Sequence, residues 1–224
     1  MELPFVDAHT HLLSGEKEIL ECVDFSSCEK LPESSVKKTL FSLGIHPAKT
    51  EVENICSLCR KMENNPSFSA VGECGMDKYL SIDIARQKEL FLQQALLAYE
   101  MDKALIIHCV KAWDILYECA KKIPRKKEKR RWLIHSFRGD LPLAEDLLRH
   151  NFTLSLAPQM VLWMPQRVKL MGNLSFLLET DDTKEDIRTI HQKAAEACGM
   201  KMEKLQEKTY SLFCEFYNYS QGDI

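Results

Sequence analysis

The sequence predicts an α/β fold, a (β/α)8 barrel of the TIM type, as a single domain over residues 1–224. Eight short apolar runs alternate with segments of helical periodicity, and no low-complexity linker or internal repeat divides the chain. Strands that alternate with helices form parallel sheets through right-handed crossovers, and eight such strands close a barrel. A length of 224 residues lies near the lower limit of this fold.

The eight apolar runs consist mostly of valine, isoleucine, leucine and phenylalanine, as expected of strands that are covered on both faces. In chain order they are Pro4–Ala8, Ile19–Phe25, Thr39–Ile45, Phe68–Gly72, Lys103–Ile107, Arg131–Ile134, Phe152–Leu156 and Leu174–Leu178.

Helices are expected between the later strands, where apolar residues recur at helical spacing. The region between His11 and Gly44 has room for a strand but hardly for two full helices, so the outer helix ring should be thin near the N-terminus. The C-terminal tail should form two helices that break at Gly199. The expected helical segments are Thr50–Asn64, Ile84–Met101, Ala112–Lys122, Leu143–His150 and Lys184–Tyr217.

Composition narrows the class of protein. The 30 basic and 33 acidic residues give a formal charge of −3, whereas proteins that wrap nucleic acid are usually basic. The nine cysteines are scattered in apolar runs, which favours reduced thiols. No signal peptide and no apolar run near the ~20 residues of a membrane span is visible. We therefore expect a soluble cytoplasmic protein without membrane contact or a stable protein partner.

Side chains that commonly bind metals stand where the expected strands end. In a (β/α)8 barrel these carboxyl ends converge on one mouth, which carries the active site. His9 and His11 lie two residues apart, so the alternation of a strand lets both point into one cavity. The other polar residues at strand ends are His46, Glu73, His108, His135, Glu179 and Asp181.

This convergence predicts a metal site. Glu73 and Asp181 follow apolar strands, where an isolated charge is costly unless it is paired or bound to metal. Imidazole and carboxylate ligands suit zinc, manganese or a related divalent ion. Six ligands shared by two ions, with one bridging carboxylate, form a typical binuclear hydrolytic site. The six candidates are His9, His11, Glu73, His108, His135 and Asp181.

Three other features are weaker. Cys56 and Cys59 have zinc-type spacing, but they lie on the apolar stripe of an expected helix and should pack in the core. The basic run Lys121–Arg131 is expected in a solvated loop at the end of the barrel opposite the mouth. The segment Met160–Met164 could form a substrate wall or merely pack, and both interpretations stay open.

The same residues resemble the TatD family of metal-dependent deoxyribonucleases, which are TIM-barrel hydrolases. Gln87 and Phe91 also match the helix that follows the family's glutamate. The matching stretches are Val6–His11, Gly44–Pro47, Ala70–Asp77, Ile106–Cys109, His135–Gly139 and Leu178–Asp181.

The resemblance implies the role of each candidate. It places His9, His11, Glu73 and Asp181 around one divalent ion. It places Glu73, His108 and His135 around a second, with Glu73 as the bridge. By the same likeness, His46 would contact the phosphate or the leaving group of the substrate. The cofactors implied are two ions per chain, of Mg, Mn or Zn.

The chain also departs from the family pattern. Val110 stands where the family usually has an arginine, and Lys111 follows it. We take Lys111 as a candidate substrate-binding residue, although strand alternation would point it away from the pocket. The loop that usually follows the last aspartate is absent after Asp181, and the region between His11 and Gly44 is short. The ligands are thus retained better than the substrate-binding elements.

The leading hypothesis is a two-metal phosphodiesterase or deoxyribonuclease that acts on nucleic-acid ends. Asp181 would serve as the general base and Glu73 as the bridging catalytic carboxylate. Two alternatives remain. The first is hydrolysis of another ester or an amide, because barrels of this kind serve several substrates. The second is a metal-binding scaffold with little or no turnover.

Overall fold

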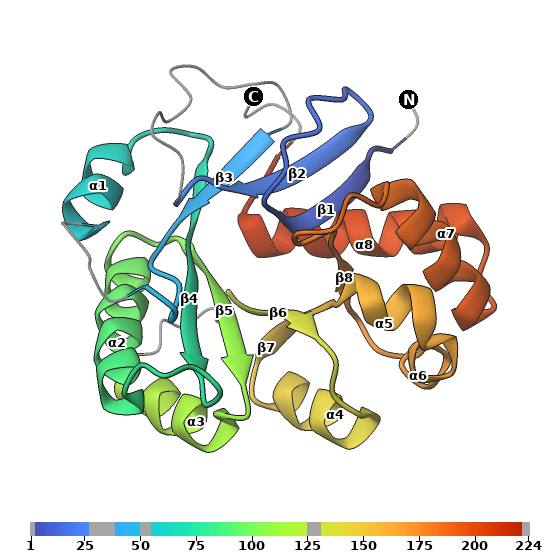
Figure 1. The fold of residues 1–224 in the computed structure, drawn as a ribbon. Helices are drawn as coiled ribbons and strands as arrows, with labels where there is room; N and C mark the ends of the chain where they lie inside the picture. Colours follow the sequence, from blue (N-terminus) through green and yellow to red (C-terminus); the bar gives the residue numbers. More distant parts are fainter. Residues whose placement is uncertain (1–2, 27–38, 50–54, 125–130, 221–224) are drawn as a thin grey trace.

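The computed structural model describes residues 3–26, 39–49, 55–124 and 131–220 (Figure 1). Its eight parallel strands pair in chain order and curl into a nearly closed barrel, which confirms the predicted fold class. A single bridge between Thr10 and Asp181 joins the last strand to the first. The strands are β1 (Phe5–Thr10), β2 (Ile19–Asp24), β3 (Thr39–Leu43), β4 (Phe68–Asp77), β5 (Ala104–Val110), β6 (Trp132–Phe137), β7 (Phe152–Leu156) and β8 (Leu177–Leu178).

Helices surround the later strands of the barrel (Figure 1). Residues 11–18, between β1 and β2, hold no helix, as the thin outer ring predicted. Two short helices over 158–170 were not expected, and residues 50–54 of the first expected helix lie outside the described residues. The helices are α1 (Ile55–Met62), α2 (Ile84–Glu100), α3 (Trp113–Lys122), α4 (Leu141–Arg149), α5 (Pro158–Trp163), α6 (Pro165–Leu170), α7 (Ile187–Cys198) and α8 (Met202–Tyr217).

Helix boundaries follow local chemistry. Asp83, Asp140 and Asp186 each precede a helix, and their carboxylates accept hydrogen bonds from backbone N–H groups of the first turn. Gly199 ends α7 with a φ of +63°, a left-handed conformation that suits glycine. The predicted break between the two C-terminal helices is therefore confirmed. None of the described helices is long and apolar enough to cross a membrane.

The barrel interior is filled in part by the C-terminal helix. Phe213, Phe216 and Tyr217 of α8 belong to the same buried cluster as the inward-facing residues of seven strands. Some of those strand residues are small, such as Ala70 and Ala104, which leaves space for the aromatic rings. In Figure 1, α8 crosses behind β1, and it contacts both β1 and β8. The helix thus packs where the first and last strands meet.

Candidate metal centre

Three strands carry one extra residue near the barrel mouth. From Asp7 to Thr10, β1 advances by three residues while its neighbour β2 advances by only two. The register shifts in the same way within β4 and β6. Such β-bulges re-aim a side chain and are common beside active sites. The extra residues lie at His9, Glu73 and His135, so the local irregularity of each strand coincides with a predicted ligand.

The bulge in β1 changes which way His9 faces. Val6 and Ala8 already belong to the interior cluster, so strict alternation would turn His9 outward. The extra residue lets His9 face inward, together with His11. Both histidines contribute to one group of possible ligand atoms, together with Asp181, although alternation alone does not bring them there.

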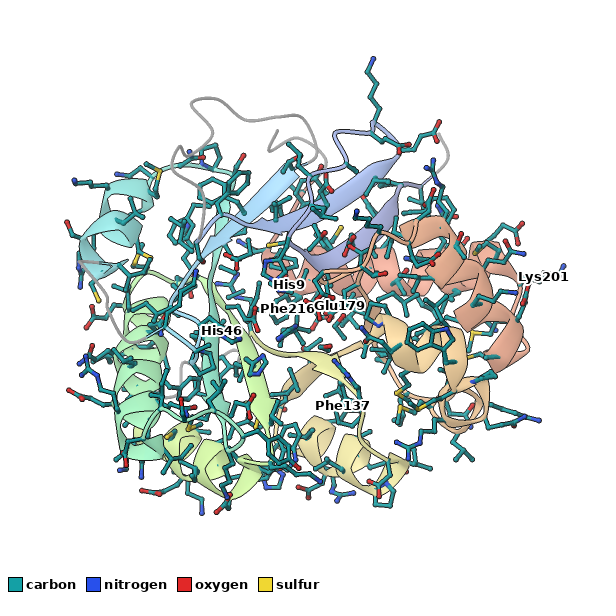
Figure 2. The ribbon with its side chains drawn as sticks, viewed as in Figure 1. His9, His46, Phe137, Glu179, Lys201 and Phe216 are labelled. Carbon is teal, nitrogen blue, oxygen red and sulfur yellow. The ribbon has the colours of Figure 1, made fainter. Side chains whose placement is uncertain are left out.

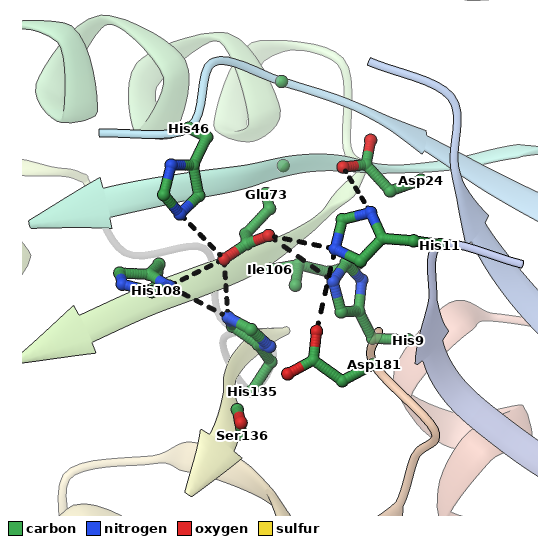
Figure 3. A network of polar contacts seen from close by, with 12 residues as sticks. His9, His11, Asp24, His46, Glu73, Ile106, His108, His135, Ser136 and Asp181 are labelled. Carbon is green, nitrogen blue, oxygen red and sulfur yellow. Dashed lines mark hydrogen bonds and ion pairs between the residues drawn. The ribbon is translucent and has the colours of Figure 1, made fainter. Parts of the chain in front are cut away.

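Glu73 lies at the centre of the site, and its two oxygens face different groups of histidines (Figure 3). Oε2 is 3.6 Å from Nε2 of His9 and 3.6 Å from Nε2 of His11. Oε1 is 2.7 Å from Nδ1 of His108 and 2.7 Å from Nε2 of His135. One carboxylate therefore faces two pairs of histidines.

Asp181 approaches the Oε2 side from the end of β8. Its Oδ1 lies 3.6 Å from Nε2 of His11. Backbone hydrogen bonds hold the residue in place: its N–H donates to the carbonyl of His9 at 3.0 Å, and its own carbonyl accepts from the N–H of His11 at 2.9 Å. Asp181 also has a φ of +55°, and strained backbone of this kind clusters at functional sites.

The histidines keep Glu73 ionised. Burial alone would raise the pKa of this carboxyl, but the facing imidazoles of His135, His108 and His11 hold it well below its usual range. The pKa of His46 is lowered by burial, with a smaller contribution from the neighbouring His108. The site therefore combines a central anion with a neutral imidazole at its edge.

The donor set fits divalent ions. His9 is fully buried, and neither of its ring nitrogens has a hydrogen-bond partner among the described residues. Glu73 Oε2, at 3.6 Å, is beyond hydrogen-bond distance, and a buried unpartnered nitrogen is costly unless something else binds it. His9 can share a cluster of ligand atoms within 4.8 Å with Glu73 and His135, or with His11 and Asp181. Imidazole and carboxylate groups at this spacing suit zinc, manganese or magnesium.

Three histidines contact a second carboxylate through the ring nitrogen that faces away from Glu73. Such partners fix the tautomer and orientation of metal-binding histidines. The three contacts, all of 3.4–3.5 Å, are His11 Nδ1 to Asp24, His108 Nε2 to Asp77 and His135 Nδ1 to Glu179.

These outer carboxylates had no predicted role. Glu179 is fully buried and also accepts a hydrogen bond from the N–H of Ser136 at 2.7 Å. Figure 2 places it near the middle of the barrel, with His9, and far from Lys201 on the outer surface. Asp24 and Asp77 are the last residues of β2 and β4. A carboxylate at the end of a buried strand was the signal that could have identified them.

His46 presents a hydrogen-bond donor to the site. Its Nδ1 accepts a hydrogen bond from the N–H of Ala48 at 3.0 Å, so the proton of the neutral ring lies on Nε2. That Nε2 is 3.4 Å from Oε1 of Glu73. Placed beside the ligand cluster, His46 can donate to an oxygen of a bound substrate.

A cavity of about 760 Å³ opens above the cluster. Lys111 lines it, so the expectation that this side chain points away from the pocket is wrong. The reason is a φ of +55° at Lys111, which interrupts the alternation at the end of β5. Val110 and Trp113 line the same cavity.

The described residues of the weaker sequence features do not line this cavity. Cys59 is buried and Cys56 packs against the core, as expected for a helix stripe, and all cysteines of the described residues are free thiols. Most of the basic run, residues 125–130, lies outside the described residues. Trp163 is 72% exposed and does not line the cavity, so the structure gives no support to a substrate wall there.

A parallel barrel whose mouth gathers histidines and carboxylates around one shared glutamate is the architecture of metal-dependent hydrolases. The profile of the family described as TatD related DNase matches residues 6–218. The chain belongs to the TatD family, and the protein is a metal-dependent hydrolase.

Known proteins resemble the chain over most of its length. An uncharacterized metal-dependent hydrolase of Methanocaldococcus jannaschii is 21% identical over 96% of this chain and 98% of its own. A human protein described as a 3'-5' RNA nuclease is 27% identical over 70% of this chain but only 24% of its own length. A TatD family hydrolase of Entamoeba histolytica superposes with a TM-score of 0.77 at 14% identity, over 97% of this chain and 99% of that one. This last likeness concerns the fold.

Proposed function

We propose that the protein hydrolyses phosphodiester bonds at nucleic-acid ends with two divalent ions per chain. The observation that carries this proposal is that the two carboxylate oxygens of Glu73 face different histidines. Oε2 faces His9 and His11, and Oε1 faces His108 and His135. A carboxylate shared in this way suits a bridge between two ions 3.5–4 Å apart, roughly the separation in two-metal hydrolases.

The six side chains divide into two ligand sets. The first set is His9, His11, Glu73 and Asp181, and the second is Glu73, His108 and His135. When bound, the ions supply a nucleophile at neutral pH and offset negative charge on the phosphate. Magnesium, manganese and zinc all accept ligands of this kind.

Two residues of the chain move or hold protons in this scheme. Asp181 reaches the cavity and lies 3.6 Å from His11, so its carboxylate is placed to accept the proton of the attacking water. His46 holds its proton on Nε2 and directs it toward the cluster, where it donates to the phosphate or to the leaving oxygen. Burial keeps this ring neutral by lowering its pKa.

The cavity suits a nucleotide. Lys49, Lys111 and Arg138 line it, and these cations favour an anionic substrate over a neutral ester or amide. Trp113 and Phe137 also line the cavity, and aromatic side chains are surfaces on which bases stack. The printed descriptions of two relatives, an RNA nuclease and a putative deoxyribonuclease of Enterocytozoon bieneusi, point in the same direction.

The test is a substrate panel. Metal-free protein is supplied with Mg²⁺, Mn²⁺ or Zn²⁺ and offered end-labelled single-stranded DNA, RNA of the same sequence, a carboxyl ester and an amide. We expect ion-dependent release of nucleotides from an end of the labelled strand. Faster turnover of the ester or the amide than of either nucleic acid would overturn the proposal in favour of the alternative hydrolase.

A further inference from the structure

Arg138 and Lys111 occupy equivalent places on neighbouring strands. Lys111 lies three residues after His108, at the exit of β5, and Arg138 lies three residues after His135, at the exit of β6. The two strands pair side by side. Both side chains line the cavity above the ligand cluster, so two cations flank the part of the cluster that faces Oε1 of Glu73.

Neither cation is neutralised by a carboxylate within the described residues. The polar partner of the Arg138 guanidinium is the hydroxyl of Ser136, at 3.5 Å. By contrast, Arg60 and Arg188, outside the cavity, have carboxylate partners at 2.6 and 2.7 Å. In a chain with a formal charge of −3, two cations without acidic partners at the active-site cavity are available to a ligand.

The backbone holds both residues in position. Lys111 has a φ of +55°, and Ser136, two residues before Arg138, has a φ of +46°. Left-handed backbone at residues other than glycine is strained and persists where the surrounding structure imposes it. These irregular strand exits interrupt the regular alternation at the positions where both residues come to line the cavity.

The chemistry of the two side chains suits a phosphate group. A guanidinium binds two phosphate oxygens at once through its planar fork, and an ammonium adds a compact point charge. Val110, which lines the same cavity, supplies neither charge nor a donor. Negative charge that develops on phosphate oxygens needs fixed positive partners.

We propose that Arg138, assisted by Lys111, is the phosphate clamp of this active site and selects anionic phosphodiesters. The inference rests on the proposed function, because it assigns the residues that recognise the substrate of that reaction. In it, Arg138 grips the non-bridging oxygens of the phosphate beside the ligand cluster, and Lys111 adds charge from the neighbouring loop.

The test compares Arg138→Ala, Arg138→Lys and Lys111→Ala with a matched control, Arg167→Ala. Arg167 is an exposed arginine nearby that donates to the carbonyl of Arg138 at 3.0 Å but does not line the cavity. If disturbed loop structure caused the effect, Arg167→Ala would also lose phosphate affinity. If only the clamp is lost, Arg167→Ala keeps its phosphate affinity. Metal content is measured for every variant and should equal that of the wild type.

Two measurements are made on each ion-loaded protein: the Kd of inorganic phosphate, by calorimetry, and the KM and kcat for a labelled single-stranded oligonucleotide. We expect Arg138→Ala to raise both the Kd and the KM by about tenfold, with a smaller rise for Arg138→Lys and for Lys111→Ala. Arg167→Ala should stay within about twofold of the wild type.

The outcomes separate the two proposals. If Arg138→Ala binds phosphate as the wild type does, the clamp is wrong, and oligonucleotide turnover by the wild type would leave the proposed function intact. If the wild type cleaves no phosphodiester but loses phosphate affinity on Arg138→Ala, the clamp stands as an anion site and the proposed function fails. If Arg167→Ala loses phosphate affinity equally, the effect comes from loop structure and the clamp is overturned.

Discussion

Where the barrel strands begin, the interior is filled with apolar side chains, including Phe213 and Phe216 from α8. Where they end, the same strands carry histidines and carboxylates around Glu73 (Figure 3). The polar end has three bulges beside candidate ligands and three residues other than glycine with positive φ, Lys111, Ser136 and Asp181. The apolar end is irregular too, with a register shift at the start of β4 and positive φ at Asp102 and Asn151. The two ends therefore differ in the side chains that the irregular positions carry, and only at the mouth do these positions coincide with candidate ligands.

The histidines at the two ends of the barrel also differ in the partners of their rings. At the mouth, His11, His108 and His135 face carboxylates on both sides of their rings. At the apolar end, His191 of α7 is fully buried and has one partner, the carbonyl of Val6, at 3.0 Å from Nε2. Substitutions at the mouth should therefore change ion binding and catalysis, and substitutions at the apolar end should change the free energy of unfolding.

The largest effect is expected for Glu73→Gln. The variant keeps the shape of the side chain but removes the charge proposed to bridge two ions, so metal content should fall below that of the wild type and kcat/KM should drop by at least about 1000-fold. Metal analysis and the circular dichroism spectrum check this. Glu21→Gln is the matched control, because Glu21 is also buried but bonds Ser14 instead of the site. Retention of two ions per chain by Glu73→Gln would contradict the bridge.

Next in size is Phe213→Ala, at the apolar end. Phe213 is fully buried, and the cavity left by truncation should lower the free energy of unfolding by about 3–5 kcal/mol. Urea unfolding measures the loss, with the exposed Ser211→Ala of the same helix as the control. Metal content and kcat/KM per folded molecule should be unchanged. A change in kcat/KM comparable to that of Glu73→Gln would break the distinction between the two ends.

A third effect concerns pH. Burial lowers the pKa of His191 to about 4. Between that value and ~6.5 the unfolded chain binds a proton that the folded chain does not, so stability is complete above pH 6.5 and falls as the pH decreases. Moving from pH 7 to pH 5 should cost about 2 kcal/mol through this residue. Urea unfolding at both pH values should show a smaller loss for His191→Gln than for the wild type, and an equal loss would exclude this role.

The smallest effect is expected for Asp24→Asn. Asp24 touches His11 on Nδ1, at 3.5 Å, and acts through that ring as a positioning residue. Its loss should weaken ion binding by about tenfold, at the low end for such partners because the contact is long. Competition with a chelating dye measures the affinity, and Asp24→Glu should restore part of it. An unchanged affinity would mean that the tautomer of His11 is set in another way.

Much of the fold and of the candidate site could be predicted, because both leave a pattern in the local sequence. Buried parallel strands appear as apolar runs, and polar residues follow them, as Glu179 and Asp181 follow Leu177–Leu178. The bulges could not be predicted, because one extra residue in β1 leaves the apolar pattern unchanged. The direction of Lys111 depends on the same kind of irregularity. The strand-end position of Asp24 could mark it as a candidate, but its partner, His11, became known only from the placement of β2.

The surface against which α8 packs could not be predicted either. Its periodicity predicts a helix, but the helical pattern of Phe213 and Phe216 does not say which surface they cover. That depends on small residues in distant strands, such as Ala70 and Ala104. The sequence pattern of one segment does not show how much space the side chains of another segment leave.

The closure of the barrel determines the order in which the site is assembled. Thr180 donates to Asp7 across 173 residues of sequence, and Tyr217 donates to the carbonyl of Ala8 across 209. The proposed ligands Glu73, His108 and His135 are already present in the first 135 residues, whereas the other set needs Asp181 to meet His9 and His11. During synthesis, the residues of one proposed ligand set are therefore complete before those of the other, and the later set depends on long-range contacts, which form slowly. If the proposed ligand sets are correct, ion binding beside Asp181 requires that the two ends of the chain have met.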